Sequence, residues 1–126
     1  MNLSYLMTIN AIVAAVFGIA FVIVPGPTLA FYGVSADAPF RLVAQLFGAA
    51  LVGFAVLTWS ARKATASDAR KAIVVALFVS DGLGFIISVI GQLQGIPNAL
   101  GWLNVVIYLL LALGFGYFQF FKTSTP

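Results

Sequence analysis

The sequence predicts an all-α integral membrane four-helix bundle whose N and C termini lie in the cytoplasm. Hydrophobic residues make up 63% of the 126 residues and charged residues only 7%. With a mean hydropathy of +1.13, the chain carries more apolar surface than a water-soluble fold could bury. Four apolar stretches of about 20 residues are each long enough to cross a hydrocarbon core of about 30 Å. We expect a single transmembrane domain, 1–126, with helices at about 3–24, 40–60, 72–91 and 101–121.

The first helix is expected to end at Pro25-Gly26-Pro27, because two prolines remove backbone donors and the glycine loosens the chain. Its apolar run is longer than that of a signal peptide, and no Lys or Arg occurs in residues 1–10, so we interpret it as a retained helix. Residues 28–39 are rich in large apolar side chains and are expected to lie along the headgroup boundary. Several aromatic residues near helix ends are typical of an interfacial belt: Tyr5, Phe31, Tyr32, Trp59 and Trp102.

The basic residues indicate the topology. The connection between the second and third helices and the segment after the fourth helix hold five of the six: Arg62, Lys63, Arg70, Lys71 and Lys122. Only Arg41 falls on the opposite side. By the positive-inside rule, this connection and both termini face the cytoplasm. The basic residues form no patch with interleaved aromatic side chains, so we expect no nucleic-acid partner.

The third and fourth helices have local start signals. Either Thr65 or Ser67 can cap the third helix, with Asp68 in its first turn, where a negative charge is favourable. Before the fourth helix, Gly95, Pro97 and Asn98 predict a turn.

Missing residue types exclude most catalytic chemistry. The chain has no His, Cys or Glu, and its acidic residues are Asp37, Asp68 and Asp81. A thiolate nucleophile, a Ser-His-Asp triad, a zinc site of the usual type and a His-ligated haem are all excluded. We therefore expect no enzymatic activity, no cofactor and no metal site.

Polar residues inside the apolar segments are the informative positions, because side chains that form hydrogen bonds turn away from lipid and toward protein. Helical spacing places each of them on one stripe with small residues. We interpret them as a broken polar column along the bundle axis and as a candidate ligand or ion pathway: Asn10, Arg41, Gln45, Asp81, Asn104 and Tyr108.

Depth along the helices predicts which of these residues meet. Asp81, Tyr108 and Asn10 fall near the midplane and within mutual reach, whereas Gln45 and Asn104 lie nearer the outer surface. The Asn and Gln side chains are expected to form interhelical hydrogen bonds. Arg41 lies at the outer rim, and two roles stay open for it: it anchors the helix to lipid headgroups, or it recognises an anionic ligand from outside.

Asp81 is the one acidic residue near the middle of a predicted span. An ionised carboxylate there costs several kcal/mol, so we expect Asp81 to be neutral, strongly hydrogen-bonded or exposed to a water-filled cavity. Two interpretations stay open. One is a proton or cation site, and the other is a structural carboxyl bonded to Tyr108, to Asn10 or to a partner subunit.

Small residues recur at four-residue spacing and predict close helix packing, with these positions foremost: Gly18, Gly48, Gly84, Ser88 and Gly116. Such ladders serve internal packing and oligomerisation equally, so monomer and homo-oligomer both stay open. Several Phe side chains could line a pocket for a flat lipophilic molecule: Phe17, Phe21, Phe47, Phe54, Phe85 and Phe115.

A series of short motifs along nearly the whole chain resembles a family of small bacterial membrane proteins with four transmembrane helices: Tyr32-Gly33, Trp59, Asp81-Gly82-Leu83-Gly84, Leu100-Gly101-Trp102 and Gly114-Phe115-Gly116-Tyr117-Phe118. The resemblance implies a multi-pass protein of the bacterial inner membrane, and it supplies no activity or catalytic residue. Small multidrug resistance transporters are less similar, because they use a membrane-embedded Glu in the first helix. Fluoride channels rely on glycine and asparagine motifs that are missing here.

Two functions are consistent with the sequence. The first is a non-enzymatic membrane protein that acts as an accessory subunit or binds a lipid, a quinone or a carotenoid. The alternative is a small proton- or cation-coupled transporter or channel that uses Asp81. The expected partners are the lipid bilayer and either other membrane subunits or a second copy of the chain.

Overall fold

The computed structural model describes residues 2–121, and most of them are helical. Four segments are long and apolar enough to span a membrane, the last of them being a helix with a π-helical extension. The elements are α1 (Leu3–Ile23), α2 (Pro25–Phe31), α3 (Ala38–Ala61), α4 (Asp68–Leu93), α5 (Gly101–Gly116) and η1 (Tyr117–Phe121). This confirms the predicted all-α bundle of a multi-pass membrane protein.

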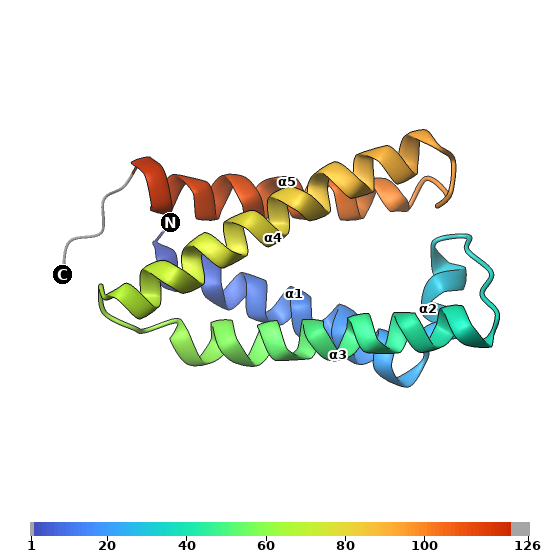
Figure 1. The fold of residues 1–126 in the computed structure, drawn as a ribbon, viewed down its shortest axis with the longest axis horizontal. Coiled ribbons are helices and arrows are strands. Elements are labelled where there is room, and N and C mark those ends of the chain that lie inside the picture. Colours follow the sequence, from blue (N-terminus) through green and yellow to red (C-terminus); the bar gives the residue numbers. More distant parts are fainter. Residues whose placement is uncertain (1, 122–126) are drawn as a thin grey trace.

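The four long helices form two antiparallel hairpins (Figure 1). In one layer α1 packs along α3, and in the other α4 packs along α5. The start of α1, the α3–α4 connection and the end of η1 lie at one end of the bundle, and α2 and the α4–α5 connection lie at the other. We call these the inner and outer ends, after the sides of the membrane that the positive-inside rule predicts. The hairpins lie close together at the inner end and diverge toward the outer end.

The helix is interrupted between α1 and α2, and a second, short helix follows at once. As predicted, α1 ends before Pro25, but proline is tolerated at the first position of a helix, so a new helix begins there. The Thr28 hydroxyl donates to the carbonyl oxygens of Val24 at 2.6 Å and Ala20 at 3.1 Å, which ties the two helices together. The sequence does not predict α2, because seven residues with two prolines carry too little helical periodicity.

Side-chain caps define the starts of α1, α3 and α4. In each case a side-chain oxygen accepts a hydrogen bond from the backbone N–H three residues later, namely Asn2 from Tyr5 at 2.9 Å, Asp37 from Phe40 at 3.0 Å and Ser67 from Arg70 at 3.1 Å. The last pair confirms the predicted cap. It also makes α4 start before the apolar stretch at 72–91, because the cap extends the helix into the polar residues that precede it.

Glycines bring α1 and α3 into backbone contact. A Cβ on Gly48 would lie 2.8 Å from the Gly18 carbonyl oxygen and 3.0 Å from the Val22 nitrogen. A Cβ on Gly18 would lie 2.9 Å from the Val52 nitrogen. Because no side chain separates the helices at this crossing, larger residues would force them apart.

Between α4 and α5, glycines make room for aromatic rings. A Cβ on Gly84 would lie 2.6 Å from Tyr108 Cδ1, and a Cβ on Gly116 would lie 2.9 Å from Phe78 Cε1. The side chain of Ser88, the remaining residue of the predicted ladder, makes no hydrogen bond among residues 2–121. In the second hairpin, the rings of Tyr108 and Phe78 therefore pack directly against the helix backbone at Gly84 and Gly116.

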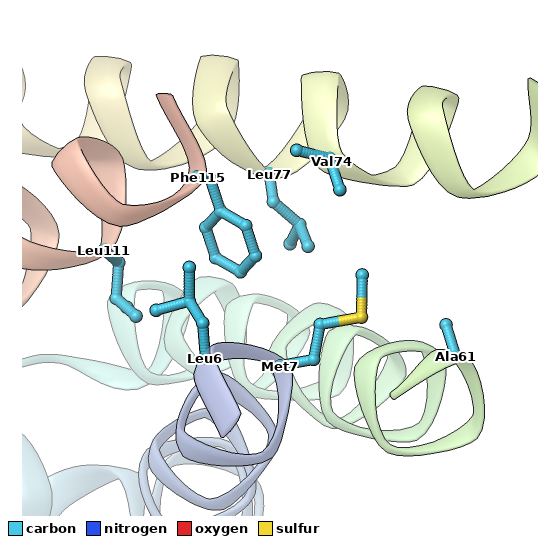
Figure 2. Close-up of a cluster of buried hydrophobic side chains, with 7 residues drawn as sticks. All are labelled: Leu6, Met7, Ala61, Val74, Leu77, Leu111 and Phe115. Carbon is cyan, nitrogen blue, oxygen red and sulfur yellow. The ribbon is translucent and has the colours of Figure 1, made fainter. Parts of the chain in front are cut away.

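An apolar core fills the inner end of the bundle (Figure 2). Side chains from all four long helices point toward one another there, namely Leu6, Met7, Ala61, Val74, Leu77, Leu111 and Phe115. Met7 and Phe115 are 0% exposed. Because every side chain in this cluster is apolar, it separates the middle of the bundle from the inner end.

Candidate functional site

A cavity of about 110 Å³ lies between the two hairpins, next to the apolar core. All four long helices contribute to its lining, which consists of Asn10, Val13, Ala14, Phe17, Phe21, Phe47, Leu51, Phe54, Leu77, Ser80, Asp81, Asn104, Ile107, Tyr108 and Leu111. Phe47 lines the cavity from α3 and is itself 43% exposed at the surface of the bundle. At about 30 Å³ per water molecule in the liquid, the cavity has room for several waters or for part of a larger molecule.

Asp81 is the one acidic side chain in the lining of this cavity. Its side chain is 6% exposed, and Oδ2 has no hydrogen-bond partner among the residues that the structure describes. Tyr108 and Asn10 line the same cavity, but neither donates a hydrogen bond to the carboxyl. Of the sequence-based alternatives, the geometry favours a carboxyl that faces a cavity over one bonded to a neighbouring helix.

Asn10 bonds instead to α3. Its Nδ2 donates to Thr58 Oγ1 at 3.4 Å. The Thr58 hydroxyl in turn donates to the carbonyl oxygen of Phe54, one turn earlier in α3, at 2.8 Å. Thr58 is fully buried, and sequence reasoning missed it. The signal that could have found it is its position three residues after Ala55 and ten after Gly48, on the stripe that faces α1.

The outer end of the cavity is covered by the turn after α2. Tyr32 Oη donates to Asn104 Oδ1 at 2.8 Å, and the Asn98 N–H donates to the Tyr32 carbonyl oxygen at 2.7 Å. The Asn98 side chain also donates to the Phe31 carbonyl oxygen at 3.2 Å. These bonds, which we call the outer latch, connect the two hairpins. Burial raises the pKa of Tyr32, so its hydroxyl stays protonated and available as the donor.

The prediction that Tyr32 belongs to the aromatic belt at the headgroups is wrong. Its side chain is only 4% exposed, because it packs inside the outer latch. Gly33, with φ of +76°, turns the chain back at this point and lies against Asn98. The other predicted belt residues are exposed near helix ends, namely Tyr5, Phe31, Trp59 and Trp102.

Two predicted members of the polar column lie outside the cavity. Gln45 Nε2 donates to the Val22 carbonyl oxygen at 3.0 Å, and Arg41 Nη1 donates to the Ala36 carbonyl oxygen at 2.6 Å. Both side chains are exposed. The predicted broken column therefore does not extend into the cavity at these two residues, because the end of α1 leaves carbonyl groups without helical partners and Gln45 donates to one of them.

The cavity therefore combines four predicted polar residues, Asn10, Asp81, Asn104 and Tyr108, with an apolar and strongly aromatic wall. Within residues 2–121, no three His, Cys, Asp or Glu side chains gather into a possible metal site. Chemically, the site offers a buried carboxyl to any molecule whose apolar part fits among the Phe and Leu side chains.

Comparison with known proteins adds no functional information. The sequence matches no protein-family model, and no curated protein or solved structure shows significant similarity to it. The resemblance to small bacterial four-helix membrane proteins stays a prediction, and the geometry of the cavity carries the functional argument.

Proposed function

We propose that this protein is a non-enzymatic membrane protein that binds a lipophilic molecule in the cavity between its two hairpins. The observation that supports this proposal is a buried carboxyl without a protein partner inside an aromatic and aliphatic chamber. Buried polar groups normally have hydrogen-bond partners, so a bound molecule with one polar group and an apolar body would complete the site. Lipids and quinones have this general character.

The surroundings of the cavity favour a molecule that arrives from the bilayer. The inner end is filled by the apolar core, and the outer end is covered by the outer latch. The α3 wall includes Phe47, a ring that is 43% exposed, and we propose this wall as the place where a membrane-dissolved molecule enters. The same binding role would suit a free-standing protein of the inner membrane or an accessory subunit of a larger complex.

Extraction from native membranes tests the proposal. Protein purified in mild detergent should carry a hydrophobic molecule that mass spectrometry identifies. Val13→Phe places a ring in the cavity and should lose that molecule, whereas Val16→Phe, at a site 61% exposed on the same helix, should retain it. A wild-type protein free of bound molecules, or equal occupancy in both variants, would contradict the proposal.

A second candidate function is proton- or cation-coupled transport by Asp81. The supporting observation is the same unpartnered carboxyl, since ionisable groups deep in a membrane bundle commonly mark ion pathways. Transport requires an ion to pass the apolar core, so the core would have to open in each cycle. Binding requires no such change, and we therefore favour it. In proteoliposomes, Asp81→Asn should abolish flux and leave the fold intact; normal flux in that variant would exclude transport through Asp81.

A further inference from the structure

We infer that the molecule bound in the cavity is a lipophilic amine whose positively charged nitrogen lies against Asp81. This inference rests on the proposed binding function and specifies its ligand class. It combines three features of the cavity, namely its charge, its aromatic lining and its small number of oxygen ligands.

The first feature is a buried carboxyl group that has no partner among the described residues. Asp81 is the only charged residue among those that the structure places around the cavity. The five basic residues that the structure describes, at 41, 62, 63, 70 and 71, lie near helix ends, and none of them lines the cavity. An unpaired carboxylate in an apolar site is costly, and a cation from outside the chain would remove that cost.

The second feature is the aromatic wall. Side chains from α1, α3 and α5 contribute rings to the lining: Phe17, Phe21, Phe47, Phe54 and Tyr108. The rings of Phe21 and Phe47 meet edge to face, with centroids 5.5 Å apart. Aromatic faces attract organic cations, and the same rings provide apolar contact for a hydrocarbon body. An amine with an apolar body uses both properties.

The third feature, the small number of oxygen ligands, argues against divalent metal ions, and the hydrogen-bonding chemistry of the carboxyl argues against carotenoids and quinones. Calcium takes six to eight oxygen ligands and magnesium prefers six, but this cavity supplies one carboxyl and a few neutral polar groups. One of those, Asn104 Oδ1, already accepts from Tyr32. A carotenoid hydrocarbon brings no polar group, and a quinone carbonyl accepts hydrogen bonds without donating any, so neither provides a donor to a carboxylate.

Paired probes of equal chain length test the inference. Radiolabelled dodecylamine, a cation at pH 7, and uncharged dodecanol are bound to the purified full-length protein in nanodiscs of neutral phospholipid, with empty nanodiscs subtracted. Because hydrogen bonds to charged groups are stronger than neutral ones, the wild type should prefer the amine by about tenfold or more. Asp81→Asn should remove this preference and keep dodecanol binding, which also reports that the variant is folded. Asp68→Asn, an exposed carboxyl at the start of α4, should behave like the wild type.

The outcomes separate this inference from the proposed function. Equal affinity of the wild type for amine and alcohol, or an amine preference that survives Asp81→Asn, overturns the amine assignment and leaves a lipophile-binding cavity in place. Tighter binding of decylubiquinone than of dodecylamine also overturns it, in favour of a neutral Asp81 that donates to a carbonyl. Binding of none of the three probes contradicts both proposals. If Asp81→Asn does not fold, Asp81→Glu should preserve the preference, and equal affinity of the wild type for amine and alcohol still overturns the inference without any variant.

Discussion

Gly48→Ala should weaken the first hairpin, because Gly48 lies where the backbones of α1 and α3 touch. The new Cβ would meet the Gly18 carbonyl oxygen and Phe21 Cβ, both at 2.8 Å, where ordinary van der Waals contact begins at 3.4 Å. The two helices must therefore separate by roughly 0.6 Å, the difference between these distances, or rotate against each other. Overpacking of this kind costs about 1–3 kcal/mol, and the better helix propensity of alanine recovers up to about 1 kcal/mol. With the full gain, we expect a net loss of up to about 2 kcal/mol in the free energy of unfolding relative to the wild type, and a loss of about 1–3 kcal/mol relative to an alanine variant that has the gain without the clash.

Unfolding in mixed micelles with increasing SDS, followed by tryptophan fluorescence, measures this loss. Gly53→Ala is the matched control on the same helix, because nothing lies within 4 Å of a Cβ at that position. It should leave stability unchanged or raise it slightly. If Gly48→Ala proves as stable as Gly53→Ala, α1 and α3 do not cross at Gly48, and the packing described above is wrong.

Three further predictions use the same unfolding assay. Tyr32→Phe removes the 2.8 Å hydrogen bond of the outer latch and should cost about 1 kcal/mol, with faster hydrogen exchange in α2; unchanged exchange would contradict the latch. Gly84→Ala displaces the Tyr108 ring and should cost about 1–3 kcal/mol, whereas Gly82→Ala, with nothing within 4 Å, should cost nothing; equal effects would refute this contact. Thr58→Val keeps the shape of the side chain but removes the acceptor for the α1 asparagine, for a loss of about 0.6–1.7 kcal/mol; full stability would show that the bond is absent.

The spans could be predicted because a bilayer imposes local requirements. A run of about 20 apolar residues is a property of the sequence alone, and caps such as Ser67 depend on neighbours a few positions away. The short helix α2 could not be predicted in the same way. Its position depends on Gly33, which turns the chain, and on Asn98, 67 positions from the Phe31 carbonyl that it binds.

The residues around the cavity could be predicted in part. Helical spacing identified Asp81 and Tyr108 on inward-facing stripes, and both line the cavity. Spacing does not give the rotation of one helix against its neighbour, so Gln45 was predicted to join the column although it turns toward the end of α1. The missing partner of Asp81 depends on how the two hairpins diverge (Figure 1), and that is a tertiary feature.

The most direct test of the binding cavity is a high-resolution structure of the protein extracted from its native membrane into polymer nanodiscs. The proposed function predicts non-protein density between the hairpins, in contact with Asp81 and with the Phe side chains of α1 and α3. A closed interface in which Asp81 bonds to another protein side chain, with no density between the hairpins, would contradict it.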